Sequence, residues 1–314
     1  MFATRQKCGL ALVSVIATLF FGIFAAFRAV AQTRDTVEAK TITLGMVAPT
    51  NQKQIEERFR DFVRYVARKL SSAPLVEGRI VVAPTQSGLA KLLIERRVDF
   101  YLESPYPTYL INDVYGAGRL LLRRWKGGMA EYYSLIFTSK NGAIKRLEDL
   151  RGKVIAFEDP GSTSGHFLPK FFLSRKGFKL SQKTQNEGKV SPEEVGYIFT
   201  YSQKKLVDLV LTKEVAAGAF SNDDYALLDE RKKSDITILA ETDKLPRHLV
   251  SVRKDLAPAV ATRLEKILLS MDKDPEGRKI LQRTDGTTKF DALPGGELAM
   301  RQRLLDIFYS PEKK

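Results

Sequence analysis

The sequence has 314 residues, of which 44% are hydrophobic, enough to form one large buried core or two smaller ones. Its formal net charge of +14 at pH 7 is compatible with nucleic acid, an acidic membrane or a small anion as partner. It contains no zinc-finger, basic-zipper or RNA-binding motif, so we expect no nucleic-acid partner, and we interpret the basic runs 204–205 and 231–233 as solvated surface.

The first 31 residues have the pattern of a secretory signal. Arg5 and Lys7 precede an apolar run over 9–27, and small residues lead to an expected cleavage site after Ala31. Cleavage would also remove Arg28, leaving a formal charge of 14 − 3 = +11. Because the apolar run is long enough to cross a bilayer, an uncleaved membrane anchor is the alternative. A cleaved signal and an uncleaved anchor both place the folded part of the protein outside the cytosol, and we expect a periplasmic location.

Cysteine and histidine are too scarce for several kinds of site. Cys8 is the only cysteine, and the residues around it do not form the lipobox of a lipoprotein. The cleaved chain would therefore contain no disulfide and no cysteine nucleophile. His166 and His248 are the only histidines, and no His-x-x-x-His spacing occurs, so we expect neither a metal site nor a cofactor.

Strands and helices alternate in the first half of the chain. Residues 41–47 and 79–83 are rich in β-branched residues and predict strands, as does the segment 98–102. Between them, 55–70 and 88–97 carry the apolar spacing of amphipathic helices. This alternation is typical of an α/β fold in which helices cover a mostly parallel sheet.

A second unit is predicted to begin near Tyr132. Its expected strands cover 133–138, 153–157, 198–201, 216–220 and 236–240, with helices over 147–152 and 204–211. The chain then returns through Pro246 to a strand at 249–252 and two helices, 257–271 and 297–309. We therefore predict one lobe inserted in another: a signal peptide over 1–31, lobe 1 over 40–131, lobe 2 over 132–245, and a return to lobe 1 with C-terminal helices over 246–314.

The segment 157–166, Phe-Glu-Asp-Pro-Gly-Ser-Thr-Ser-Gly-His, carries the clearest functional pattern. A buried strand leads into a Pro/Gly turn, and three hydroxyl residues follow where a helix begins. Unpaired N–H groups and the dipole at a helix start favour an anion, and the ends of parallel strands are where open α/β sheets bind ligands. Taken alone, the hydroxyls also fit a simple N-cap that binds nothing.

Five motifs in one order resemble the phosphonate/phosphite/phosphate-type periplasmic binding proteins of ABC transporters. They are Asp159-Pro-x-Ser-Thr-Ser-Gly-x-x-x-Pro169, Val98-Asp99 followed by Pro105, Tyr132-Tyr133-Ser134, Leu150-Arg-Gly-Lys-Val154 and Lys244-Leu-Pro246. The resemblance covers residues from about Ile42 to about Ile280. It favours the anion-binding interpretation of the hydroxyl turn over the simple N-cap.

The resemblance implies a type II periplasmic binding protein: two α/β lobes, joined by two crossing strands, that close on a ligand like a hinge. The implied ligand is a small phosphorus oxoanion (phosphate, phosphite or phosphonate), and the implied partner is an ABC permease in the inner membrane. Ser162, Thr163 and Ser164 would bind the phosphoryl oxygens, and Gly165 would let the ligand approach the backbone. Tyr132 would either donate its phenol or form an apolar wall.

Several positions depart from the family pattern. Gln203 stands where the family has a histidine, and Gln86 replaces a second tyrosine. Members that bind 2-aminoethylphosphonate hold its ammonium with two acids. Asp223 retains one of these acids, but His248 stands near the other. One acid and one imidazole attract an ammonium less than two carboxylates do, so we do not expect an aminoalkyl ligand.

Five further residues are expected in or near the binding cleft or in the core. Glu103 stands where the family has an apolar residue, and it would either accept a hydrogen from a monoprotonated oxoanion or face solvent. Tyr106 would line the same mouth, whereas Tyr109 is expected in the core. His166 is expected to pack within its helix, and contact of His248 with the ligand is left open.

Two other functions compete with transport. A phosphate-ester-handling enzyme is disfavoured because the sequence has no nucleophile elbow, no Walker loop and no acidic metal cluster. A periplasmic sensor would hand its closed state to a receptor kinase ectodomain, and ligand-driven closure serves both uses. We expect a monomer in either case.

Overall fold

The computed structural model describes residues 41–49, 51–71, 76–183 and 190–309. The predicted signal segment lies outside these residues, so its cleavage remains a prediction. Within the described ranges, no helix combines the length and apolar character needed to cross a membrane.

The first sheet has the strand order β14-β4-β13-β3-β1-β2. Its strands are β1 (Thr41–Val47), β2 (Glu77–Ala83), β3 (Phe100–Glu103), β4 (Gly118–Lys126), β13 (His248–Arg253) and β14 (Thr287–Asp291). β1 pairs in parallel with β2 and β3, whereas β13 and β14 add antiparallel pairings. The sheet is therefore mixed, because β13 and β14, which come from the returning chain, run opposite to the other four strands.

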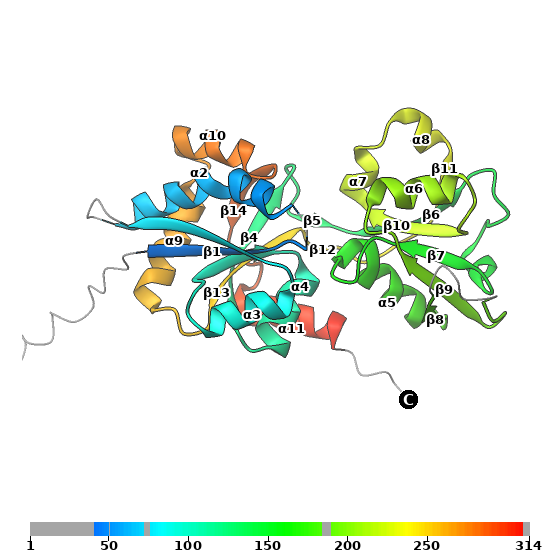
Figure 1. Cartoon of the computed structure of the whole chain (residues 1–314), viewed down its shortest axis with the longest axis horizontal. Coiled ribbons are helices and arrows are strands. Elements are labelled where there is room, and N and C mark those ends of the chain that lie inside the picture. The colour runs from blue at the N-terminus through cyan, green and yellow to red at the C-terminus, as the bar shows by residue number, and fades with distance from the viewer. Residues whose placement is uncertain (1–40, 50, 72–75, 184–189, 310–314) are drawn as a thin grey trace, which may run out of the picture. The chain divides into compact units, whose positions relative to one another are not determined.

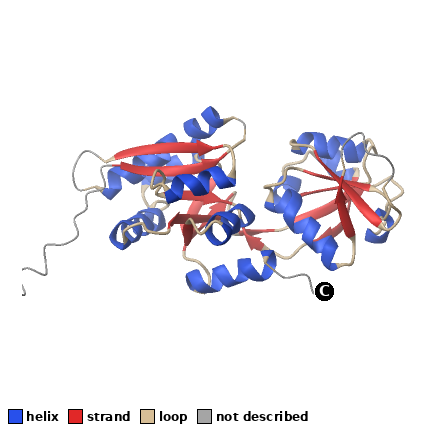
Figure 2. Cartoon of the chain, turned by 60° about the horizontal axis from the view of Figure 1, so that its bottom comes forward, coloured by secondary structure: helices blue, strands red, loops and turns tan. Residues whose placement is uncertain are grey.

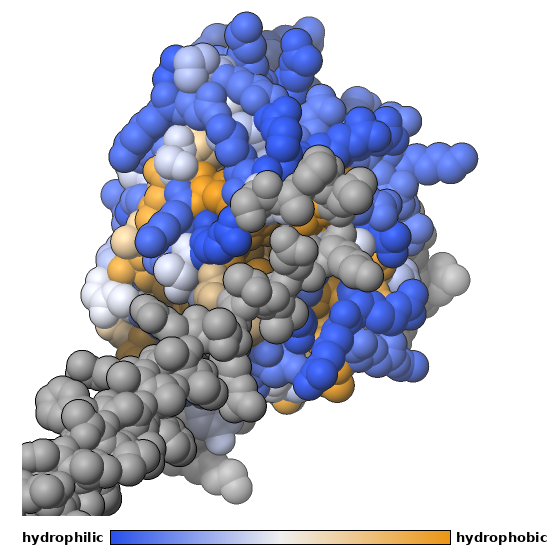
Figure 3. Space-filling view, turned by 90° about the vertical axis from the view of Figure 1, so that its left-hand side faces the viewer, coloured by the Kyte–Doolittle hydropathy of each residue, from blue (hydrophilic) through white to orange (hydrophobic). Residues whose placement is uncertain are grey.

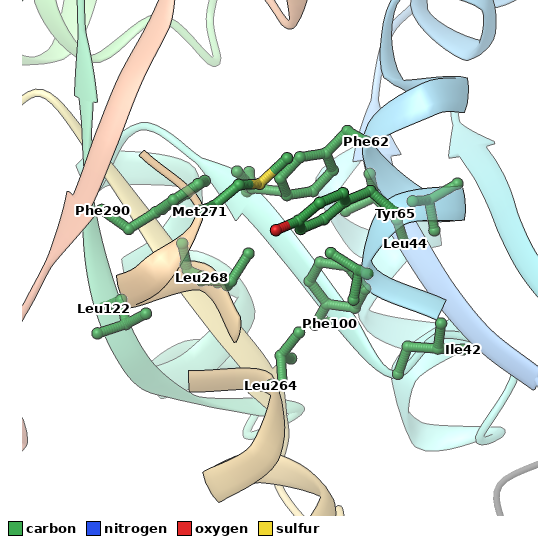
Figure 4. Close-up of a cluster of buried hydrophobic side chains, with 14 of the residues drawn as sticks. Ile42, Leu44, Phe62, Tyr65, Phe100, Leu122, Leu264, Leu268, Met271 and Phe290 are labelled. Carbon is green, nitrogen blue, oxygen red and sulfur yellow. The ribbon is translucent and has the colours of Figure 1, made fainter. Parts of the chain in front are cut away.

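Helices pack on both faces of this sheet (Figure 2). They are α2 (Gln52–Leu70), α3 (Gln86–Ile94), α4 (Pro105–Tyr109), the π-helical turn η1 (Leu110–Val114), α9 (Pro258–Ser270), α10 (Pro275–Arg283) and α11 (Gly296–Phe308). In α2, Phe59, Phe62, Val66 and Leu70 are buried at helical spacing. These side chains form one core with the strands and α9, and Figure 4 shows Phe62 and Met271 facing each other within it.

The second sheet has the order β11-β6-β10-β7-β9-β8. Its strands are β6 (Ser134–Ser139), β7 (Val154–Phe157), β8 (Lys179–Gln182), β9 (Glu194–Phe199), β10 (Ala217–Ser221) and β11 (Ile236–Glu241). β7, β8, β9 and β10 run parallel, and β6 is antiparallel to β10 and β11. This sheet too is mixed.

The helical elements of the second unit are η2 (Leu147–Leu150), η3 (Thr163–Phe167), α5 (Leu168–Arg175), α6 (Gln203–Leu211), α7 (Asn222–Ala226) and α8 (Glu230–Ser234). Two apolar clusters form around the sheet, one with Leu173 of α5 and one with Leu206 of α6. Each lobe thus has its own core, as expected for a lobe that folds around its own sheet.

Two short strands connect the lobes. β5 (Glu131–Tyr132) pairs with β12 (Leu245–Pro246) in a separate two-stranded sheet, and Figure 1 shows both labels between the two larger sheets. The predicted lobe limits, 131/132 and 245/246, fall in these two strands.

The visible face of the first lobe is mostly hydrophilic. The space-filling view shows hydrophilic side chains over most of the visible face, with smaller apolar areas between them (Figure 3). The basic runs 204–205 and 231–233 lie in lobe 2, where Lys204, Lys205 and Arg231 are exposed and Lys232 and Lys233 are partly buried.

Candidate functional site

Three strand ends of lobe 2 carry predicted site residues. β9, β7 and β10 are parallel neighbours, so their carboxyl ends lie at one edge of the sheet. β9 leads to Gln203 at the first position of α6, β7 leads to the turn 162–165, and β10 leads to Asp223 in α7. The fold therefore places these residues at one edge although about 60 residues of sequence separate them.

Lobe 1 presents a matching edge. β2, β1 and β3 are parallel neighbours, and Gln86 and Tyr106 follow the ends of β2 and β3. Glu103 is the last residue of β3. Carboxyl ends of parallel strands are the usual ligand-binding edge of open α/β sheets. Each lobe thus contributes such an edge.

The two edges are in contact at the hydroxyl turn. Thr163 Oγ1 donates to Ser104 Oγ (2.9 Å) and accepts from the backbone N–H of Tyr106 (3.0 Å). A Cβ built on Gly161 would lie 2.5 Å from Gln86 Nε2, so Gln86 also reaches lobe 2. The turn therefore meets lobe 1 directly, and a ligand would replace some of these protein contacts.

Ser162 caps the helical segment that begins at Thr163. Its Oγ accepts from the N–H of Gly165 (3.0 Å) and donates to Glu158 Oε2 (3.0 Å). The start of the helix is thus fixed at η3, and Pro169 is tolerated because it occupies the first turn of α5. A Cβ at Gly165 would lie 2.8 Å from both Glu158 and Ser162, so the turn requires glycine there.

Tyr132 joins the connecting strands to the turn. Its side chain is almost fully buried and packs with Leu168 and Leu245. Burial raises the pKa of Tyr132 to about 12, and the charge of Arg247, followed by the nearby Thr163 and Ser164 hydroxyls, opposes part of the rise. The structure therefore gives Tyr132 both features considered from the sequence, a phenol at the turn and an apolar contact surface.

Arg247 is a charged group that the sequence analysis missed. It follows Pro246 directly, and its guanidinium lies 4.5 Å from the centre of the Tyr132 ring. It also forms an ion pair of 2.7 Å with Asp223. An arginine at a predicted lobe crossing is a signal that sequence reading could have used, because chain crossings lie beside the ligand in a hinged protein.

A second cation lies in the first sheet, next to His248. Arg124 is fully buried in β4 and donates to His248 Nδ1 (3.0 Å), so His248 accepts at that nitrogen. The pKa of His248 lies well below its usual range. Burial is the largest cause, and the positive charges of Arg124 and Arg247 lower the pKa further. Lys126 acts in the same direction. A positive field that opposes a protonated imidazole favours a bound anion.

Carboxyl groups near the turn have raised pKa values. Burial raises the pKa of Glu103 to about 7, although N–H groups of Ser104 and Val47 oppose the rise. Burial likewise raises the pKa of Glu158 and of Asp159. A protonated carboxyl does not repel an anion, so Glu103, with a pKa of about 7, is more compatible with an anionic ligand than its formal charge indicates.

Two aromatic predictions can be compared with the structure. The Tyr106 ring stacks on Phe167 at 4.1 Å and meets Phe308 edge-on, so it packs among aromatic rings and its backbone N–H reaches the turn. His166 packs against Phe199, as expected. Its Nδ1 donates a hydrogen bond to the Pro160 carbonyl at 3.1 Å.

Sequence comparison identifies the family. The profile of the family described as "ABC transporter, phosphonate, periplasmic substrate-binding protein" matches residues 44–294. The chain belongs to this family. A phosphonate-family member of this kind is a substrate-binding component of a periplasmic transport system and not an enzyme.

Solved structures support the assignment of this phosphonate-family chain to the type II fold. XAC2383 from Xanthomonas citri, bound to chloride ion, is 26% identical with a TM-score of 0.79, covering 85% of this chain and 96% of that one. The same protein bound to ATP is 28% identical with a TM-score of 0.76, covering 86% and 99%. PhnD1 from Prochlorococcus marinus, in complex with methylphosphonate, is 16% identical with a TM-score of 0.62, covering 86% and 97%, and shows the shared fold.

One curated relative of the phosphonate-family chain is similar over a shorter length. "Phosphate-import protein PhnD" of Mycolicibacterium smegmatis is 27% identical over 142 residues, which is 44% of this chain and 43% of that protein. The match therefore spans less than half of that relative.

No comparison assigns ligand contacts to individual residues of this chain. The structure gathers Ser162, Thr163, Ser164, Gly165 and Tyr132 at the turn and places Gln86, Glu103 and Tyr106 on the edge of lobe 1. Gln203 and Asp223 follow strand ends at the edge of lobe 2 that carries the turn, and His248 begins β13, where it accepts from Arg124. Among the residues that the structure describes, no three or more acidic, histidine or cysteine side chains form a metal-binding group.

Proposed function

We propose that this protein captures a small phosphorus oxoanion (phosphate, phosphite or a phosphonate) outside the cytoplasm and delivers it to an ABC permease. The observation that carries the proposal is the hydroxyl turn at the start of η3, with Arg247 over the ring of the buried Tyr132. Hydroxyl donors at a helix start together with a fixed cation suit a tetrahedral anion.

The relatives are consistent with this ligand class. One is named for phosphate import, and one of the similar folds holds methylphosphonate. The family assignment supports a permease as the partner, since its members are ABC transporter components. We further propose an exported monomer whose signal segment is cleaved after Ala31, which N-terminal sequencing and light scattering of the periplasmic protein would test.

A second ligand class has one observation in its favour. XAC2383, at 28% identity and with 99% of its length covered, holds ATP. A nucleoside phosphate presents the same phosphoryl oxygens to the turn, but it carries a base and a ribose that need additional space.

A calorimetric panel on the protein purified from periplasm tests the proposal. The ligands are phosphate, phosphite, methylphosphonate and ATP, with sulfate as a tetrahedral control. A specific ligand at one hundred times its Kd should stabilise the fold by about 2.7 kcal/mol, and it should be recovered unchanged. If the phosphorus oxoanions bind no better than sulfate, the proposed function is wrong.

A further inference from the structure

The ion pair between Arg247 and Asp223 has an uneven geometry. Both Nε and Nη2 of Arg247 approach the same carboxylate oxygen, Oδ2, at 2.7 Å. The two side chains are only 10% and 15% exposed. Arginine usually meets a carboxylate with two nitrogens on two oxygens. Here Asp223 Oδ2 receives both contacts, so Asp223 Oδ1 and Arg247 Nη1 are not used by the ion pair.

That remaining capacity is found on both partners. Asp223 Oδ1 is buried and has no hydrogen-bond partner in the described part of the chain. Arg247 Nη1 likewise makes no hydrogen bond to the described residues, so one of its donor groups is available. Buried polar atoms in native proteins nearly always have partners. Asp223 Oδ1 can therefore accept one hydrogen bond from a ligand, and a protonated phosphoryl oxygen supplies that donor without adding a positive charge.

The pair also lies next to the hydroxyl turn. Arg247 stacks on Tyr132, whose hydroxyl meets Thr163 and Ser164. The charge of Arg247 also acts on Glu158, the acid that holds Ser162. The guanidinium therefore lies beside the position where the proposed function places the oxoanion, and Asp223 is the ion-pair partner of that guanidinium.

We infer that Arg247 sets the charge selectivity of the binding site. Its guanidinium provides the positive charge that a phosphoryl oxygen meets. By occupying Asp223, the same guanidinium keeps that carboxylate from attracting a cationic group of a ligand. The site therefore accepts phosphorus oxoanions that carry no ammonium, and it disfavours those that do. This inference rests on the proposed function and names the residue that narrows its ligand class.

The test compares two ligands of similar size, methylphosphonate and 2-aminoethylphosphonate, by calorimetry on the protein from periplasm. Native protein should prefer methylphosphonate by roughly tenfold or more. Arg247→Gln frees the Asp223 carboxylate and should move that preference by roughly tenfold towards 2-aminoethylphosphonate. Asp223→Asn frees the guanidinium and should move it the other way. Opposite shifts from two members of one ion pair are not expected of a merely structural contact.

A matched control exists in lobe 1. Arg123 pairs with Asp291 through Nε and Nη2 at 2.9 and 2.6 Å, away from the turn. Arg123→Gln should leave the preference between the two phosphonates unchanged. If Arg247→Gln does not fold, the double variant Arg247→Gln/Asp223→Asn replaces both charges by amides and should bring the two affinities together.

The possible results separate the two claims. If native protein binds neither phosphonate nor phosphate, the proposed function fails. If it binds methylphosphonate, but the preference is the same in native protein and in the Arg247 and Asp223 variants, the inference about Arg247 is wrong and the proposed function stands. Equal losses of both ligands in Arg247→Gln would also overturn the inference, because they would assign Arg247 a structural role only.

Discussion

The hydroxyls of Ser162 and Thr163 are engaged by protein atoms: Ser162 by Glu158 and Gly165, and Thr163 by Ser104 and Tyr106. A ligand gains affinity only by the difference between its own contacts and those it replaces. A charged oxoanion provides that difference, since hydrogen bonds to charged groups are stronger than those between neutral groups.

Replacing both hydroxyls should therefore weaken oxoanion binding. Ser162→Ala/Thr163→Ala should raise the Kd at least tenfold, because each hydrogen bond to a charged group contributes about 1.5–3 kcal/mol. Calorimetry measures this directly. The control is Ser234→Ala/Thr212→Ala, which removes hydroxyls at exposed helix ends of the same lobe. Unchanged affinity in the first variant would contradict this ligand-binding role of the turn.

Glu103 gives a pH-dependent prediction at the residue scale. Its pKa of about 7 lies above the ordinary value of 4.5 because it is buried, so the folded state binds more protons than the unfolded state between these values. Stability without ligand should therefore fall as pH rises from about 4.5 to 7, by at most about 3 kcal/mol. Glu103→Gln should remove this part of the decline in denaturant titrations at pH 5 and pH 8. Parallel curves for native protein and variant would show that Glu103 titrates normally.

At the scale of elements, glycine fixes how β7 passes into η3. The N–H of Glu158 donates to the Gly165 carbonyl, which folds the loop back on the strand it leaves. The side chain of Glu158 also fills the space beside Gly165. The turn keeps its hydroxyls in place because backbone and side chain close around a residue that has no Cβ.

Gly165→Ala should consequently destabilise the protein by about 1–3 kcal/mol, the usual cost of overpacking a buried site. Binding should weaken as well, because Ser162 would shift with the turn. Urea unfolding measures the first effect and calorimetry the second. Gly88→Ala in α3 is the comparison, since the added Cβ would lie 3.2 Å from the Thr85 hydroxyl, a smaller overlap than at Gly165, and alanine suits a helix. Equal stability of the Gly165 variant and native protein would mean that the turn adapts easily.

Sequence reading reached the fold because the strongest signals are local. The spacing of apolar residues in α2 and the buried run of β7 indicate helix and strand without reference to the rest of the chain. The hydroxyl turn was found for the same reason. The antiparallel strands β4 and β14 were missed, because a strand shows its pairing direction only through distant partners. The ion pair of Arg247 with Asp223 was missed for the same reason, because its two residues lie in different parts of the sequence.

At the scale of the whole molecule, the formal charge of +11 expected after cleavage should affect how fast an anion arrives more than how tightly it is held. Exposed charges are screened by salt, whereas the buried Arg124 is screened much less. The two contributions can therefore be separated by ionic strength. Raising NaCl from low to high concentration should slow association severalfold and leave dissociation nearly unchanged.

Exposed cations far from the turn provide the decisive variant. Lys140→Glu/Arg231→Glu changes two exposed residues of lobe 2 and lowers the formal charge of the cleaved chain from +11 to 11 − 4 = +7. Its association rate at low salt should fall, and its dependence on salt should become shallower, while its dissociation rate stays that of native protein. Stopped-flow mixing with a binding phosphonate measures all three quantities. If the association rate of the variant equals that of native protein at low salt, the attraction comes from the buried cations at the site alone, since those are unchanged in the variant.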